Sequence, residues 1–200
     1  VYTAPIQVSG NSTIKIATVL PSGKMSRVRT ISVEKQDYAP ASKVSAVKPG
    51  LQMSRVKGNY LTVEQLNWTD SAWQKSTISD LNEMKIKQPE DAATLRGHNN
   101  YAAIAEGYIQ VPEDGVYYLS SRLDQVWIDN KLMIDNGTDV KASTTHDTSV
   151  ALAKGLHPVK VVFLANIVGG WPGWWNHLSI EMRKDNHEKF EAVKGSQFFH

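Results

Sequence analysis

The chain has 200 residues, with 22 lysines and arginines, 20 aspartates and glutamates and a formal net charge of +2. Both signs are dispersed along the chain without a basic stripe, which argues against a nucleic-acid-binding protein. The absence of cysteine excludes disulfides, thiol nucleophiles and thiolate metal sites, and no apolar run approaches the ~20 residues that span a bilayer.

The first segment, residues 1–36, alternates apolar and polar side chains in short runs. Ile14 and Ile16 flank Lys15, and a similar alternation comes after the turn at residues 21–23. A period of two predicts short antiparallel strands. Roughly three such strands are few for an independent sandwich. We therefore expect this segment to be part of a larger β domain or to pack on the rest of the chain.

A change of composition separates this segment from the rest of the chain. Residues 37–49 hold two prolines, three alanines and two serines, which is typical of a linker. A second unit is predicted over residues 50–184, where strand patterns become dense from Tyr101 onward, and residues 185–200 are predicted to be a C-terminal tail. Helical periodicity is weak. The fold class is therefore all-β, with the turn spacing of a sandwich or barrel.

The run from Gly107 to Asp135 reads as two strand pairs joined by a polar corner. Asp129 and Asn130 lie between two apolar runs and tolerate the left-handed backbone of a tight hairpin. The corner itself is formed by residues 123–125. We expect it to place the Asp124 carboxylate and the Gln125 amide at the rim of a sheet, where a ligand can reach them.

A second feature is the loop at residues 169–175, which contains three tryptophans among glycines and a proline. Flat indoles at a loop tip suit the apolar faces of sugar rings, although each ring could equally fold back to cap the end of the barrel. We expect at least one to be exposed. The predicted carbohydrate-binding residues are Asp124, Gln125, Trp171, Trp174 and Trp175.

No pattern supports catalysis by this chain. A retaining glycosidase needs two carboxyl groups ~5–5.5 Å apart in a cleft, whereas the acidic residues here fall mostly in turns or on polar strand faces. The six histidines show no metal-ligand spacing, and no serine lies in a Gly-x-Ser-x-Gly elbow. We predict no catalytic residue and no cofactor.

The stretch from Gly50 to about Arg183 resembles the protective-antigen-type carbohydrate-binding domain, a β-sandwich or barrel module attached to glycosidases, adhesins and toxins. The matching pieces are residues 50–51, 105–117, 123–135 and 152–159. Calcium-dependent members of that family carry two adjacent acidic residues at the corner. Here the corner reads Asp124-Gln125, so the resemblance leaves Asp124 as a single, weak calcium candidate.

Residues 1–36 resemble the second half of the small, immunoglobulin-like β domain at the C-terminal end of chitobiases and β-hexosaminidases. The matching pieces are residues 2–6, 12–17 and 23–28. The combination resembles the C-terminal region of a family 20 glycoside hydrolase, a β-N-acetylhexosaminidase.

That resemblance implies a non-catalytic accessory region of an exported bacterial enzyme, periplasmic, surface-bound or secreted. It would bind glycans that contain N-acetylhexosamine and accompany an upstream catalytic domain. The alternative is a structural module that packs on the catalytic domain, shapes its active-site rim and binds no sugar.

Overall fold

The computed structural model describes residues 2–69, 71–91, 97–137, 146–168, 171–184 and 189–200. The chain forms two compact units, Val1–Asp37 and Tyr38–His200. Residues 38–49 therefore belong to the second unit instead of linking two domains. Backbone hydrogen bonds hold them there: the Ala39 amide donates to the Ala151 carbonyl at 2.9 Å, and the Lys48 amide donates to the His200 carbonyl at 2.7 Å.

The first unit is a single hairpin in its described residues. Strands β1 (Ser12–Ile16) and β2 (Arg29–Val33) pair antiparallel, with Ile14 opposite Ile31. Large apolar side chains stay exposed, among them Val19 at 62% and Met25 at 65%. A two-stranded hairpin is marginally stable alone, and this one leaves apolar surface that a larger β domain would bury.

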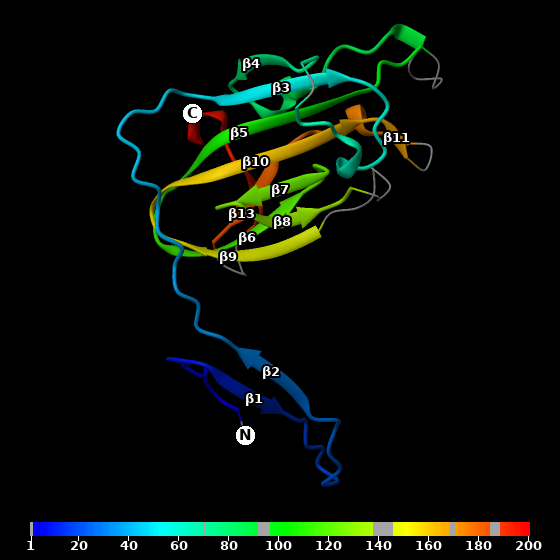
Figure 1. Cartoon of the computed structure of the whole chain (residues 1–200). Helices are drawn as coiled ribbons and strands as arrows, with labels where there is room; N and C mark the ends of the chain where they lie inside the picture. The colour runs from blue at the N-terminus through cyan, green and yellow to red at the C-terminus, as the bar shows by residue number, and fades with distance from the viewer. Residues whose placement is uncertain (1, 70, 92–96, 138–145, 169–170, 185–188) are drawn as a thin grey trace. The chain divides into compact units, whose positions relative to one another are not determined.

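The described residues of the second unit form two large antiparallel sheets and one small one (Figure 1). The seven-stranded sheet has the order β4-β3-β5-β10-β7-β8, with β15 also pairing with β5, and the four-stranded sheet has the order β14-β13-β6-β9. The first sheet comprises β3 (Leu51–Lys57), β4 (Gln74–Ile78), β5 (Tyr101–Val111), β7 (Gln125–Ile128), β8 (Lys131–Asp135), β10 (Gly155–Ala165) and β15 (Phe198–Phe199). The second comprises β6 (Gly115–Ser121), β9 (His146–Leu152), β13 (Ile180–Arg183) and β14 (Glu191–Ala192).

Short elements complete the unit. Strands β11 (Ile167–Val168) and β12 (Trp171–Pro172) form a small hairpin. The helical turns in the described residues are all 3-10: η1 (Val63–Gln65), η2 (Leu81–Met84), η4 (Gly173–Trp175) and η5 (Gly195–Gln197). The all-β prediction is confirmed. No helix in this described portion is long and apolar enough to cross a membrane.

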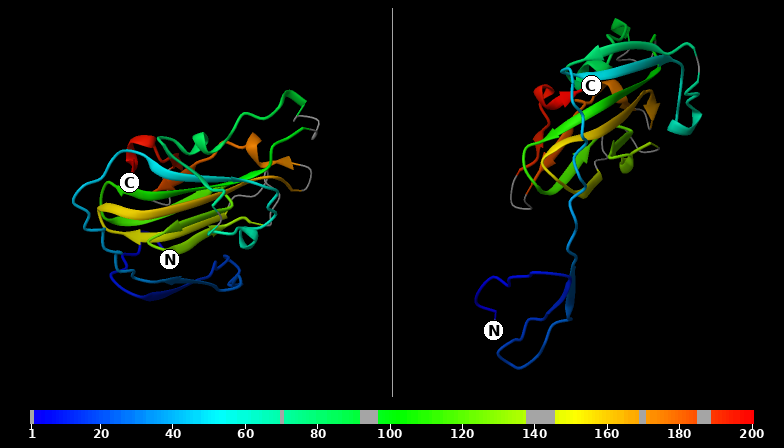
Figure 2. Two further views of the ribbon diagram at one scale, coloured as in Figure 1. Left: turned by 45° about the horizontal axis from the view of Figure 1, so that its top comes forward. Right: turned by 60° about the vertical axis from the view of Figure 1, so that its left-hand side comes forward.

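The main core lies between the two sheets, which overlap in Figures 1 and 2. Alternate residues of the long central strands β5 and β10 face it, including Ala103, Ala105 and Phe163, and Leu119 and Ile180 meet them from the second sheet. The intervening residues Ala102, Ile104, Val162 and Leu164 belong instead to a second apolar cluster. The seven-stranded sheet is therefore apolar on both faces over part of its length.

The run predicted as two hairpins contains only one. Asp129 and Asn130 adopt φ values of 50° and 61° in the tight turn between β7 and β8, as expected. The turn at Pro112–Gly115 is different, because it carries the chain from β5 in one sheet to β6 in the other. Strand β5 already has β3 and β15 on one edge and β10 on the other, so no edge remains for β6.

The predicted C-terminal tail is also part of the fold. Strand β14 pairs with β13, and β15 pairs with β5 beyond the end of β3. The Phe198 side chain is fully buried in the main core. Phe198 also accepts a backbone hydrogen bond from the Gly50 amide at 2.8 Å. The last residues therefore close one side of the seven-stranded sheet.

Gly50→Ala is expected to destabilise the second unit by about 1–3 kcal/mol. Gly50 has φ +95°, and an added Cβ would lie 2.4 Å from the Ile78 carbonyl oxygen. Urea unfolding followed by tryptophan fluorescence measures the change, since all six tryptophans lie after residue 37. Gly137→Ala is the control, because its Cβ would meet only a flexible Asp135 oxygen at 3.2 Å. Equal stability of the two variants would contradict the prediction.

Candidate functional site

The polar corner lies inside the molecule. Asp124 is 1% exposed and Gln125 is 6% exposed. One Asp124 carboxylate oxygen (Oδ2) accepts the backbone N–H of Leu164 in β10 at 2.7 Å. The corner therefore does not lie at an open rim as expected, while direct sugar contact by these two residues stays a prediction. The physical reason is the topology: the chain crosses here from β6 in one sheet to β7 in the other, and the crossing passes through the interior.

Gln125 has a different partner. Its Oε1 accepts the indole N–H of Trp127 at 3.1 Å, so the amide fixes the orientation of that ring. Gln125 is opposite Val162 in β10, and Val162 belongs to the second apolar cluster. Gln125 is thus buried on the outer face of the seven-stranded sheet, beside the neighbouring Trp127.

Asn136 stabilises the same corner through hydrogen bonds. Its Nδ2 donates to the carbonyls of Ser121 at 3.0 Å and Leu123 at 2.8 Å, and its backbone N–H donates to the Asp124 carbonyl at 2.7 Å. Its Oδ1 is buried without a hydrogen-bond partner. Asn136 therefore closes the corner.

The described residues do not fit a calcium ion at this corner. Calcium takes six to eight oxygen ligands. The corner offers the Asp124 carboxylate, one oxygen of which already accepts the Leu164 amide, and the Asn136 Oδ1. No group of three or more histidine, cysteine or acidic residues is placed to hold a metal within the described part of the chain. No role is assigned to calcium here.

The tryptophan loop places its rings in different environments. Trp171 lies in β12, and its side chain falls outside the described residues, as do residues 169–170. Trp174 is buried at 8% and stacks on His98, with ring centroids 5.7 Å apart. Trp175 is 51% exposed and borders a cavity of about 480 Å³ lined also by residues 85–90. The expectation of at least one exposed ring is confirmed.

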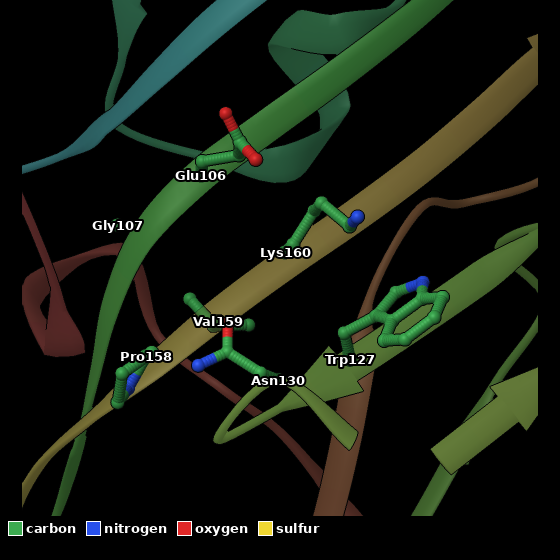
Figure 3. A pocket seen from close by; sticks show the side chains of 7 residues that line it. All are labelled: Glu106, Gly107, Trp127, Asn130, Pro158, Val159 and Lys160. Atoms are coloured by element: carbon green, nitrogen blue, oxygen red, sulfur yellow. The ribbon is translucent and has the colours of Figure 1, made fainter. Parts of the chain in front are cut away.

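A site that the sequence patterns did not reveal lies on the outer face of the seven-stranded sheet. Glu106, Lys160 and Trp127 occupy neighbouring positions on β5, β10 and β7, as the strand register shows. Figure 3 shows the three side chains on this face, beside a pocket of about 320 Å³. Gly107, Asn130, Pro158 and Val159 complete its lining.

Lys160 is held between two indoles. Its ammonium nitrogen is 4.5 Å from the ring centroid of Trp127 and 5.5 Å from that of Trp68. Cation–π contacts at these distances contribute about 0.5–1 kcal/mol each at exposed sites. They fix the lysine stem and both rings relative to the sheet. The result is a rigid surface with aromatic, cationic and anionic groups in one row.

Trp68 comes from the segment that covers the neighbouring part of this face. Val63 and Leu66 of that segment pack in the second apolar cluster with the outer residues of β5 and β10. Trp68 stacks on Trp73, with centroids 6.1 Å apart and planes 4° apart, and remains 51% exposed. The Trp73 indole N–H donates to the Asn67 carbonyl at 2.8 Å.

Comparison with known proteins places this chain in a family. The PA14 domain model matches residues 74–196. A β-hexosaminidase from Porphyromonas gingivalis (strain ATCC BAA-308 / W83) is 37% identical over 203 residues, which cover 99% of this chain and 25% of the relative. The chain thus spans about a quarter of the length of that relative.

Solved structures also match. An anti-sigma factor domain-containing protein gives a TM-score of 0.54 at 14% identity, over 90% of this chain and 56% of that one. The PA14 domain of the MpAFP antifreeze protein gives 0.48 at 12% identity, over 82% and 96%. At such identities, the first of these likenesses shows the fold alone.

Proposed function

The chain belongs to the PA14 domain family, and from that premise we propose that it is a non-catalytic carbohydrate-binding accessory region of a glycoside hydrolase. Its resemblance to a protective-antigen-type domain within a β-hexosaminidase is confirmed by the family match and by the relative. Since the relative is about four times as long, the activity, substrate and partners of the whole protein are part of the proposal.

We further propose an identity for the parent protein, which is the longer glycoside hydrolase that contains this chain. The parent is a β-N-acetylhexosaminidase exported by a bacterium, and the glycans bound contain N-acetylhexosamine. A catalytic domain lies upstream. Residues 1–36 are the second half of a chitobiase-type β domain whose other half precedes them. The apolar surface left exposed by the β1–β2 hairpin supports that last assignment.

The row formed by Glu106, Lys160 and Trp127 is the observation that carries the binding proposal. The Trp127 indole, partly exposed and oriented by Gln125, offers apolar ring surface to a pyranose ring. A carboxylate accepts hydrogen bonds from sugar hydroxyls, and an ammonium donates to them. Gln125 orients Trp127 through its hydrogen bond to the indole. Asp124 anchors the neighbouring corner through its bond to the Leu164 amide.

Trp127→Ala is expected to weaken binding of the β-1,4-linked N-acetylglucosamine dimer at least tenfold, or about 1.4 kcal/mol. The stacking plate is lost, while the strand register and the buried core below it stay in place. Isothermal titration calorimetry on the whole chain measures the affinity, and a thermal melt checks folding. Trp175→Ala is the matched control, because it removes an exposed indole outside this row. Failure of the unmodified chain to bind any N-acetylhexosamine-containing glycan would overturn the proposal.

Trp175 supports the alternative of a structural module. Its half-exposed ring borders a cavity that could receive a side chain of the catalytic domain. In that case the isolated chain binds no sugar, and Trp175→Ala in the parent enzyme lowers its stability or shifts its substrate preference. Unchanged parent stability and kinetics would remove this alternative.

A further inference from the structure

We propose that the outer face of the seven-stranded sheet binds a linear oligosaccharide of at least two consecutive sugar rings, laid across the strands, and not a single terminal sugar. This inference rests on the proposed carbohydrate-binding function and adds the ligand class and its direction. It starts from two pockets that share one residue. Glu106 lines both the pocket beside Trp127 and a second pocket of about 430 Å³ beside Trp68 and Trp73.

The strand register sets the direction of the groove. Trp127, Lys160, Glu106 and Gln52 are successive cross-strand partners on β7, β10, β5 and β3. The second pocket continues over Ser54 of β3 and its cross-strand partner Lys75 of β4. Neighbouring strands are about 4.8 Å apart, so the four strand spacings from Trp127 on β7 to Lys75 on β4 span roughly 19 Å. A single sugar ring cannot bridge that distance. A ligand that fills both pockets therefore runs across the strands.

The two ends of the groove carry the same kind of group. Trp127 borders one pocket, and the stacked pair of Trp68 and Trp73 borders the other. Lys160 contacts an indole from each end. Two aromatic plates separated by a charged middle can hold two apolar ring faces of one chain, with the hydroxyls between them directed at Glu106 and Lys160.

The lining of the second pocket suits sugar hydroxyls. Ser54, Thr69 and Ser71 contribute short hydroxyl groups there, and Ile104 supplies an apolar floor. The two serine hydroxyls can both donate and accept, whereas the Thr69 hydroxyl donates to the Asn67 Oδ1 at 2.9 Å and offers an acceptor. The second pocket is therefore a second sugar subsite, and Glu106 marks the junction between the two.

Calorimetric titration of the whole chain with N-acetylglucosamine and with its β-1,4-linked dimer and tetramer tests this inference. We expect the affinity to rise at least tenfold from monomer to tetramer. Trp68→Ala should abolish that gain, because it removes an aromatic plate of the second subsite. Trp127→Ala should weaken the binding of all three sugars.

Glu106→Gln is a second variant whose folding is safe, since Glu106 is exposed. It should weaken tetramer binding about fivefold, as it keeps the shape of the side chain and removes its charge. Monomer binding with no gain for the tetramer would overturn the linear groove and leave the proposed function standing. Unchanged tetramer affinity in both Trp68→Ala and Glu106→Gln would also overturn the linear groove, and it would leave the proposed function standing. Absence of binding to all three sugars would overturn both the linear groove and the proposed carbohydrate-binding function.

Discussion

Asp124→Ala is expected to lower the free energy of unfolding of the second unit by about 2–3 kcal/mol. The carboxylate is 1% exposed and accepts the Leu164 amide at 2.7 Å. Alanine would leave that buried N–H of β10 without its acceptor, and a lost hydrogen bond to a charged group costs more than a neutral one. The bond also joins the β6–β7 corner to β10 in the centre of the seven-stranded sheet.

Asp124→Asn is the matched control, because its amide oxygen can still accept the Leu164 N–H. It should recover at least half of the stability that alanine loses. Urea unfolding monitored by tryptophan fluorescence gives both values. An alanine variant within about 0.5 kcal/mol of the unmodified chain would show that Asp124 does not hold the corner.

The same pair of variants separates a structural role from direct sugar contact. If Asp124 acts only as an anchor, Asp124→Asn should bind the N-acetylglucosamine tetramer as the unmodified chain does. A variant that folds normally and loses sugar binding would support the direct contact predicted from the sequence, which stays a prediction. Sugar titration of Asp124→Asn alongside its unfolding curve makes the distinction.

Local sequence patterns predicted the local structure well. Alternation of apolar and polar residues identified most strands, although it predicted roughly three in residues 1–36, where the described residues form two. The Asp129-Asn130 pair identified the β7–β8 hairpin, since few other residues adopt two successive positive φ values. These features depend on neighbours in sequence. The same logic located the corner at residues 123–125 as a special point of the chain.

Strand order could not be predicted in the same way, and the candidate site depends on it. A turn such as Pro112–Gly115 has the same composition whether it closes a hairpin or crosses between sheets. Glu106, Trp127 and Lys160 lie far apart in sequence and meet only because β5, β10 and β7 are neighbours. The burial of Asp124 results from the same crossing. No local signal distinguishes a polar corner under a sheet from one at its rim.

The C-terminal residues illustrate the same limit. Residues 189–200 contain charged side chains that read as a solvated tail. Phe198 is nevertheless opposite Ile109 in the register of β15 with β5, and the edge of β5 beyond β3 offers unpaired backbone groups there. Backbone pairing at an open edge depends little on composition, so the sequence could not reveal it.

His157→Ala is expected to destabilise the second unit by about 3–5 kcal/mol. The ring is fully buried, with Nδ1 2.9 Å from an Asp129 carboxylate oxygen and Nε2 2.8 Å from the Ala153 carbonyl oxygen. It thereby joins the β7–β8 turn to the turn between β9 and β10. Alanine would leave a cavity and strip both oxygens of their partner, and the two penalties add.

Asp129→Gly isolates the carboxylate half of this effect, because glycine keeps the φ of 50° that the turn requires. It should cost about 1–3 kcal/mol, the penalty for a lost partner. The double variant should cost less than the sum of the two single variants by about 1–2 kcal/mol, since the two residues share one contact. Strict additivity in urea unfolding would show that the pair does not couple the two turns.

Because Asn130, the other residue of the β7–β8 turn, lines the pocket beside Trp127, loosening that turn should also weaken sugar binding without altering any indole.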